Sequence, residues 1–393
     1  MSPQGEHQTF REEVKDMANR LPEDIEESGK TMLFEVSQTG DGDQTDLTRS
    51  SLYPIRSKLP AFLRNPFVWF SVILLLLIGL VFGLLYGLGG NDTPSDTSDV
   101  PTETTEPSST EKEPAAWRVG GLLDVETLSA GSLHSDFTLL VNLDTMQAVA
   151  GQKIHEKMYP ASMTKIMTFI VAYENIPDRA VLLEVTKAIK SQYPEASRVG
   201  IDIGDFMTAE QCLMAMILES DTDSVLMLVE KVAGNEAAFV ALMNEKAQEM
   251  GLVSTHFENA TGLHHKDHYS TACEMAEITA YAMQYPLFKE AFCSYSYATK
   301  LKYYKNGVLT DYNMTFYNST LRGRLEENGV SAKLSDGGEI LGGKTGFTDE
   351  AKYCQAALAK ASDGTLYVAI FGHAASAEKS AKDTRWLFNH YLD

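Results

Sequence analysis

Residues 160–171 read PASMTKIMTFIV. The apolar part of this stretch predicts a buried helix, and Pro160 suits the approach to its N-terminus. Ser162 and Lys165 are three positions apart, so they share one face of that helix. A serine hydroxyl is a weak nucleophile, but a desolvated lysine beside it can lose its charge and take the proton. The stretch therefore predicts a serine acyl-transfer centre, with helix N–H groups aimed at developing negative charge.

The same Ser-x-x-Lys spacing also occurs at Ser109–Lys112 and Ser376–Lys379, where no apolar helix follows. The ordinary structural role of this pattern is a helix-capping serine with a solvated lysine. The spacing alone is therefore a weak signal, and the prediction depends on what accompanies it.

A second motif is Gly343-Lys344-Thr345-Gly346, which lies in ILGGKTGFTD at 340–349. An exposed cation followed by a hydroxyl can hold a carboxylate, and small glycines let a substrate backbone lie close. The strand-like run YCQAALA at 353–359 follows it. A strand end or a turn would be the ordinary role of such a tripeptide.

A third polar element, Ser220-Asp221-Thr222, interrupts two apolar helical stretches, 214–218 and 225–229. A small polar cluster between buried helices usually forms a turn and a helix cap. Here it could also place the Ser220 hydroxyl opposite the nucleophile.

The remaining pattern of the folded part predicts its architecture. Strand-like runs at 137–143 and 367–372 lie near its two ends, with helical patterns at 209–232 and 236–250 between them. This order indicates an α+β domain whose sheet is formed by both ends of the segment, with an inserted helical part.

These motifs, in this order, resemble the Ser-x-x-Lys, Ser-x-Asn, Lys-Thr-Gly set of penicillin-recognising serine enzymes. More closely, the chain resembles the low-molecular-weight penicillin-binding proteins of the D-alanyl-D-alanine carboxypeptidase family. The resemblance covers most of 135–390, and four stretches carry it: 158–168, 255–263, 268–272 and 343–351. It implies a penicillin-binding/β-lactamase-like fold, an antiparallel sheet flanked by helices with an inserted helical subdomain.

The resemblance also implies a mechanism without a cofactor or metal. Ser162 would attack the carbonyl between two terminal D-alanines of a peptidoglycan stem peptide, Lys165 would act as base and Ser220 would relay a proton. Lys344 and Thr345, with Gly346 beside them, would bind the terminal carboxylate. The N–H groups of Ser162 and Phe347 would form the oxyanion hole. β-Lactams would acylate Ser162.

One departure from the family is Thr222, which stands where the middle motif has asparagine. An asparagine amide donates and accepts hydrogen bonds at once, whereas threonine carries only a hydroxyl. A catalytically weak or inactive domain that binds wall peptide as a scaffold is therefore an alternative. A β-lactamase is a less favoured one, because no Glu-x-x-x-Asn stretch lies between Ser220 and Lys344.

The apolar run 67–88 carries no charge and predicts a transmembrane helix, since at 1.5 Å per residue it spans roughly 33 Å. Basic residues precede it and acidic ones follow. The positive-inside rule therefore places the N-terminus in the cytoplasm and the C-terminal part outside a bacterial cell membrane. We expect 1–66 to be a disordered acidic tail, 89–116 a Ser/Thr/Pro/Glu-rich linker, and 117–393 the catalytic domain.

The net charge of −21 without a basic stripe argues against nucleic acid as a partner. The four cysteines, Cys212, Cys273, Cys293 and Cys354, lie far apart. An exported chain could oxidise two of them, but isolated buried thiols are the favoured interpretation. The histidines of 256–268 match no common metal spacing, so we expect a loop rather than a metal site, with Ser270 or Thr271 capping the next helix.

Overall fold

The structure, a computed structural model, describes residues 117–129, 131–318 and 320–392. Within them, no helix is both long and apolar enough to cross a membrane. The predicted tail, transmembrane helix and linker at 1–66, 67–88 and 89–116 lie outside the described residues.

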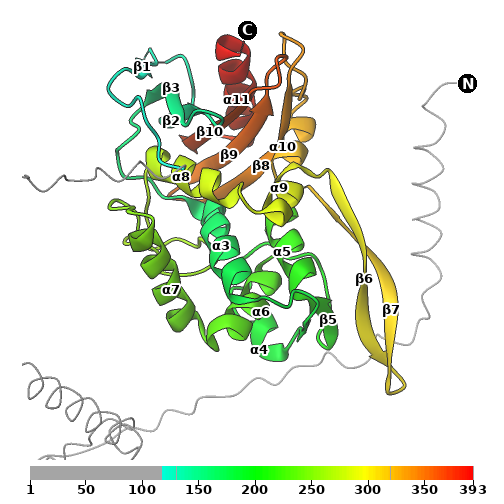
Figure 1. Ribbon diagram of the computed structural model, residues 1–393. Helices are drawn as coiled ribbons and strands as arrows, with labels where there is room; N and C mark the ends of the chain where they lie inside the picture. Colours follow the sequence, from blue (N-terminus) through cyan, green and yellow to red (C-terminus); the bar gives the residue numbers. More distant parts are fainter. Residues whose placement is uncertain (1–116, 130, 319, 393) are drawn as a thin grey trace, which may run out of the picture. The chain divides into compact units, whose positions relative to one another are not determined.

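A six-stranded sheet, in the order β1-β3-β2-β10-β9-β8, forms the framework (Figure 1). Its strands are β1 (Glu126–Thr127), β2 (Phe137–Asn142), β3 (Gln147–Gln152), β8 (Glu339–Thr348), β9 (Lys352–Lys360) and β10 (Leu366–Ala374). All neighbours are antiparallel except β1 and β3. The predicted strands at 137–143 and 367–372 are β2 and β10, and they pair with each other at the centre of the sheet. The predicted sheet formed by both ends of the domain is confirmed.

Both faces of the central strands are buried, which explains their nearly continuous apolar sequences. In β2, Leu139 and Val141 belong to the larger core and Leu140 to a smaller one. The smaller core lies under α10 (Leu321–Glu327) and α11 (Ala377–Tyr391). On the opposite face, α8 (Ala272–Ala282) contacts β2 and β10.

The predicted helical insertion lies between β3 and α8. It contains the 3₁₀ turn η2 (Ala161–Thr164) and helices α3 (Lys165–Asn175), α4 (Lys187–Ser191), α5 (Ala209–Leu218), α6 (Thr222–Ala233) and α7 (Glu236–Glu249). The break predicted at Ser220-Asp221-Thr222 separates α5 from α6, and Asp221 caps α6 by accepting a hydrogen bond from the N–H of Ser224. Thr271 is the cap of α8, as predicted.

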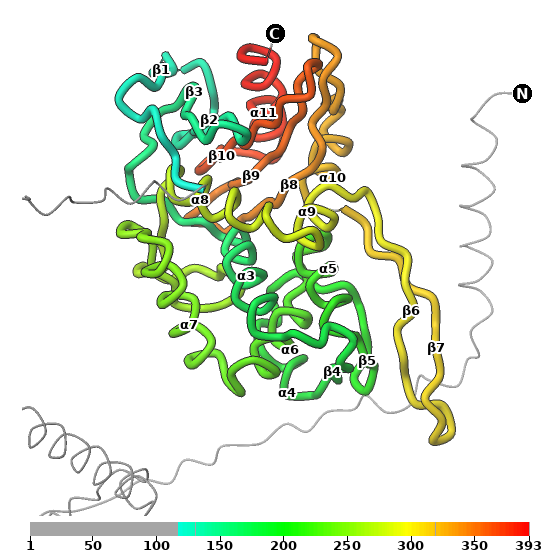
Figure 2. The backbone as a smooth tube through the Cα atoms, viewed as in Figure 1, coloured from blue at the N-terminus to red at the C-terminus, as the bar shows by residue number. Residues whose placement is uncertain are grey.

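A second sheet, which the sequence patterns did not predict, lies beside the insertion. It has the order β4-β5-β6-β7, with β4 (Leu182–Glu184), β5 (Asp205–Thr208), β6 (Ser296–Lys305) and β7 (Val308–Tyr317). Helix α9 (Pro286–Cys293) leads into it. Figure 2 shows β6 and β7 running out together as one long hairpin at the side of the domain.

Candidate active site

The turn that carries Ser162 is held in an unusual backbone conformation. Ala161 has a positive φ of 47°, although it is not glycine. Such residues cost energy and are found where the surrounding structure enforces them, often at functional sites. Gly262 lies against this turn so closely that a Cβ on it would come within 1.9 Å of the Ala161 carbonyl oxygen. The 255–263 segment therefore supports the turn from behind.

Lys165, at the start of α3, points back at Ser162. Its Nζ donates to Ser162 Oγ at 3.1 Å and to the carbonyl oxygen of Thr261 at 2.7 Å. The side chain is buried, and burial lowers the pKa of Lys165 to about 7, against an opposing effect of Asp221. A large share of these amines is therefore neutral near pH 7. A neutral amine beside a serine hydroxyl can accept its proton.

The Thr261 carbonyl is fixed by an asparagine turn that the sequence analysis did not assign a role. Asn259 Oδ1 accepts hydrogen bonds from the N–H groups of Thr261, Gly262 and Leu263 at 3.1, 2.7 and 3.2 Å. It also accepts one from Thr261 Oγ1 at 2.9 Å. This turn lies inside the 255–263 stretch, which carries the family resemblance, although the sequence alone assigns Asn259 no role.

On the opposite side of the cleft, Ser220 Oγ accepts a hydrogen bond from Lys344 Nζ at 3.0 Å. Ser220, like Ala161, has a positive φ, here 58°. Lys344 Nζ also donates to the Thr345 carbonyl at 2.8 Å. The prediction that Lys344 is an exposed cation is wrong: the residue is 0% exposed. Burial, then Lys165 and Arg324, hold the pKa of Lys344 well below its usual value.

Thr222 lines the cleft, but its hydroxyl is not used. The residue is buried, and Oγ1 has no hydrogen-bond partner in the described part of the chain. Its backbone N–H donates to the Ser197 carbonyl at 3.0 Å, which ties α6 to the segment before β5. Next to it, the buried Asp223 pairs with Lys190 Nζ at 2.7 Å and with Arg198. These pairs fix the 195–197 segment, which forms one wall of the cleft.

Strand β8 forms the other wall, because it is an edge strand of the six-stranded sheet. A Cβ on Gly346 would lie 2.8 Å from the Ser162 nitrogen and 3.0 Å from the Pro160 carbonyl oxygen, so only glycine lets the strand run this close. Phe347 is 48% exposed and packs on Tyr353 with ring centroids 4.6 Å apart.

Together these elements enclose a cleft of about 280 Å³. Among its lining residues are Ser162, Lys165, Glu195, Glu219, Ser220, Thr222, Thr261, Thr320, Arg324, Thr345, Gly346 and Phe347. The structure thus brings the predicted site residues together around this cleft. Lys344 does not line it, but its Nζ contacts the lining residue Ser220.

Arg324 is a site residue that the sequence analysis missed, because it lies in the ordinary charged run LRGRLEE of α10. It is buried, and its Nη1 donates to the Cys354 carbonyl and Gln355 Oε1 at 3.2 and 3.1 Å. Burial lowers the pKa of Arg324 to about 10, so the guanidinium stays charged near neutral pH. It adds positive charge at the cleft, where an anionic group of a ligand would be favoured.

His268 holds Thr164, the residue before Lys165. Its Nδ1 accepts from the N–H of Glu258 at 3.2 Å, so Nε2 carries the proton and donates to Thr164 Oγ1 at 2.7 Å. Burial, followed by the neighbouring histidines, lowers the pKa of His268 to about 3, so the ring is neutral.

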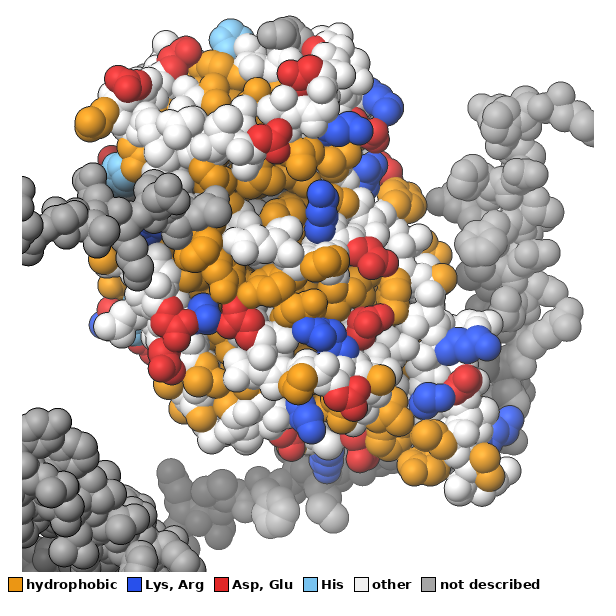
Figure 3. Space-filling model, viewed as in Figure 1, with side chains coloured by type: hydrophobic (Ala, Val, Ile, Leu, Met, Phe, Trp, Pro, Cys, Tyr) orange, Lys and Arg blue, Asp and Glu red, His pale blue; other side chains and the backbone are white. Residues whose placement is uncertain are grey.

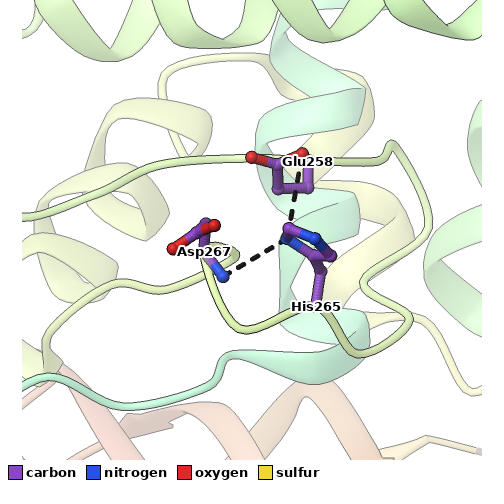
Figure 4. Close-up of side chains that lie close together, drawn as sticks. All are labelled: Glu258, His265 and Asp267. Atoms are coloured by element: carbon purple, nitrogen blue, oxygen red, sulfur yellow. Dashed lines mark hydrogen bonds and ion pairs between the residues drawn. The ribbon is translucent and has the colours of Figure 1, made fainter.

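The loop around His268 also gathers Glu258, His265 and Asp267 (Figure 4), whose possible ligand atoms lie within 4.8 Å of one another. The Asp267 N–H donates to His265 Nδ1 at 3.3 Å, and the Asp267 carboxylate pairs with Lys266 Nζ at 2.6 Å. Since these groups already have partners and lie near the surface, we assign the cluster no metal-binding role. The four cysteines are free thiols.

Comparison with known proteins decides the family. The model of the D-alanyl-D-alanine carboxypeptidase family of serine peptidases matches residues 124–375. The chain belongs to this family. The matched range begins just before β1 and ends just after β10, so it covers both walls of the cleft. The carboxypeptidase family is the one that the sequence motifs resembled.

Two curated relatives show how far the likeness extends. D-alanyl-D-alanine carboxypeptidase DacF of Bacillus subtilis is 31% identical over 252 residues, which are 63% of this chain and 60% of that protein. A D-alanyl-D-alanine carboxypeptidase of a Streptomyces species is 27% identical over 249 residues, 58% of this chain and 81% of that one. The chain thus spans less than two thirds of the Bacillus relative.

Solved structures agree with the fold. The Streptomyces K15 DD-transpeptidase has a TM-score of 0.59 at 23% identity, and the match covers 67% of this chain and 98% of that one. A D-alanyl-D-alanine carboxypeptidase from Mycobacterium tuberculosis has a TM-score of 0.54 at 23% identity, over 67% of this chain and 94% of that one. The mixed α+β, penicillin-binding-like fold predicted from the sequence is confirmed.

Proposed function

We propose that this protein is a serine-type D-alanyl-D-alanine carboxypeptidase that removes the terminal D-alanine from peptidoglycan stem peptides through an acyl-enzyme and is inhibited by β-lactams. The observation that carries the proposal is the contact of Lys165 Nζ with Ser162 Oγ at 3.1 Å, made by a lysine whose burial favours the neutral amine.

Acylation follows from this geometry. The neutral amine of Lys165 takes the proton of Ser162 as Oγ attacks the carbonyl between the two D-alanines. Negative charge develops on that carbonyl oxygen, and the N–H groups of Ser162 and Phe347 are the proposed donors. The leaving amine needs a proton, and Ser220, which is hydrogen-bonded to Lys344 Nζ, is the proposed relay for the proton that Lys165 took from Ser162. Water then hydrolyses the ester in the second half-reaction.

Binding of the terminal carboxylate falls to the Thr345 hydroxyl and the nearby cationic groups. Thr345 and Arg324 line the cleft, and Lys344 lies directly behind its wall. The sequence predicted Lys344 and Thr345 as the groups that bind this carboxylate. The proposal now adds Arg324 to them, and Lys344 would act from a buried position.

We further propose the location predicted from the sequence: a bacterial cell membrane, a single span at 67–88, the N-terminus in the cytoplasm and the catalytic domain outside. The apolar run and its flanking charges support this location. A substrate in the cell wall is reachable only from that side.

A second candidate function is a weak or inactive wall-peptide-binding domain, and one observation favours it. The Thr222 hydroxyl, which has no hydrogen-bond partner among the described residues, stands where the family has an asparagine amide. Loss of one hydrogen bond to a reacting substrate commonly costs about 1–3 kcal/mol, which slows an enzyme about tenfold to a hundredfold without abolishing it. We therefore favour slow turnover over none.

The test uses residues 117–393, a fluorescent penicillin and a peptide ending in D-Ala-D-Ala. We expect labelling and D-alanine release, both lost in Ser162→Ala. Ser376→Ala is the matched control, because Ser376 belongs to another Ser-x-x-Lys but only caps α11, accepting from the Lys379 N–H at 3.1 Å. Absence of both label and release from folded protein would refute the proposal. Rapid hydrolysis of the penicillin would instead indicate a β-lactamase.

A further inference from the structure

The hairpin of β6 and β7 is a long and well-defined projection. Its strands pair without a break in register, from Ser296 opposite Tyr317 to Lys305 opposite Val308. The turn residues Asn306 and Gly307 both have positive φ, 52° and 77°, as in the two-residue turns that suit the twist of a hairpin. At about 3.3 Å per residue the strands span roughly 33 Å.

The end of this hairpin exposes large apolar side chains. Tyr304 is 61% exposed, Val308 65% and Leu309 38%. Ile203, 58% exposed, lies two residues before β5, whose Asp205 pairs with Tyr303 of β6. We call Ile203, Tyr304, Val308 and Leu309 the tip cluster. Neighbouring exposed apolar residues of this size commonly mark a surface that contacts a partner.

Lysines flank the tip cluster in a chain whose net charge is −21. They are Lys300, Lys302 and Lys305, all on β6. Figure 3 shows blue Lys and Arg side chains beside orange apolar surface at the lower right, over the hairpin.

The acidic groups nearby are partly compensated. Asp311 is paired with Lys302 at 2.6 Å, and Asp205 accepts from the Tyr312 hydroxyl at 2.6 Å. Asp202, and Glu184 on β4, are exposed. Tyrosine with lysine is the combination typical of the boundary between membrane and water, where lysine is attracted to anionic headgroups.

We infer that the tip cluster docks on an anionic phospholipid surface, the outer face of the membrane to which the chain is anchored. This inference rests on the proposed location. A linker of the length and composition of 89–116 would span about 30 Å on average by coil statistics. Tethering at that range gives a high effective concentration, so even a weak surface contact would be occupied.

Docking would also orient the cleft, because the base of the hairpin is joined to it. The Tyr317 N–H donates to Glu219 Oε1 at 2.8 Å, and Thr320 Oγ1 donates to the Gly343 carbonyl at 2.9 Å. Glu219 and Thr320 both line the cleft. A docked tip would therefore hold the cleft roughly one strand length, about 33 Å, from the lipid.

The experiment measures sedimentation of residues 117–393 with vesicles. This segment is expected to fold alone, since it corresponds to nearly the whole solved chain of the Streptomyces K15 enzyme. Vesicles contain either phosphatidylglycerol with phosphatidylcholine or phosphatidylcholine alone. We expect binding to the anionic vesicles, weakened at least fivefold in Tyr304→Ser/Leu309→Ser and in Lys300→Gln/Lys305→Gln. Val253→Ser is the matched control, because Val253 is 92% exposed elsewhere.

Absence of vesicle binding, or binding that the tip variants leave unchanged, would overturn the inference. So would a dimer in light scattering that the tip variants dissociate without any vesicle binding, since a second copy would then be the occupant. Penicillin labelling of Ser162 is measured on the same samples. If the unsubstituted protein binds vesicles but is not labelled, the proposed function is refuted. If it is labelled but does not bind vesicles, the docking is refuted.

Discussion

The pH dependence of acylation offers the sharpest test of the base. Lys165 must be neutral to accept the proton of Ser162, and burial lowers its pKa to about 7. The neutral fraction is then about one half at pH 7, one tenth at pH 6 and one hundredth at pH 5. The second-order rate constant for acylation should therefore rise about tenfold from pH 5 to pH 6, about fivefold from pH 6 to pH 7, and level off above pH 8. With an ordinary lysine pKa it would keep rising to about pH 10.

The assay is the rate of labelling by a fluorescent penicillin between pH 5 and pH 10, with circular dichroism to confirm the fold at each pH. Asp221→Asn provides an internal check. The Asp221 charge raises the pKa of Lys165, so its removal should move the midpoint to lower pH. Asparagine keeps a side-chain oxygen to cap α6. A rate constant that is flat from pH 5 to pH 8, or one that still rises at pH 10, would refute this account of Lys165.

Three further predictions concern single residues. Thr222→Asn places an amide where an unpartnered hydroxyl now lines the cleft, and should raise the acylation rate about tenfold; an unchanged or lower rate would contradict this. Gly262→Ala should abolish labelling or folding, because its Cβ would come within 1.9 Å of the Ala161 carbonyl oxygen and φ is +87°; near-normal labelling would show that the turn can move. Asp383→Asn should destabilise the fold by about 1–3 kcal/mol, since its buried carboxylate accepts from the Ser135 N–H and hydroxyl, both at 2.7 Å; urea denaturation with the labelling assay as control measures this loss.

The central strands and the break between α5 and α6 could be predicted because local patterns specify them. β2 and β10 are short apolar runs with β-branched and aromatic residues, and the polar break carries its own helix cap. That Ser162, Lys165 and the Lys-Thr-Gly strand share one cleft could be predicted because these motifs occur together with Ser220-Asp221-Thr222, in the order of the family. These features are encoded within a few consecutive residues.

What could not be predicted depends on packing between distant segments. Arg324 reaches the cleft because α10 packs under β8, and nothing in its own run of charges marks it. Lys344 is buried, since its side chain is directed to Ser220 across 124 positions of sequence, whereas a lysine is normally expected to be solvated. The second sheet was missed although Asn306-Gly307 is a recognised hairpin signal, because the strands around it carry many polar residues.

The pairing of β2 with β10 has a consequence for the order in which activity is acquired. Asn142 lies opposite Tyr367, so the centre of the main sheet joins segments more than two hundred residues apart. During synthesis, the helical insertion with Ser162 and Lys165 emerges well before β8, β9 and β10. Until those strands arrive, β2 has an open edge and one wall of the cleft is missing. Ser162, the proposed nucleophile, is therefore synthesised early, but its cleft is complete only when the sheet closes. On the proposed mechanism, a nascent chain would form no acyl-enzyme before that point.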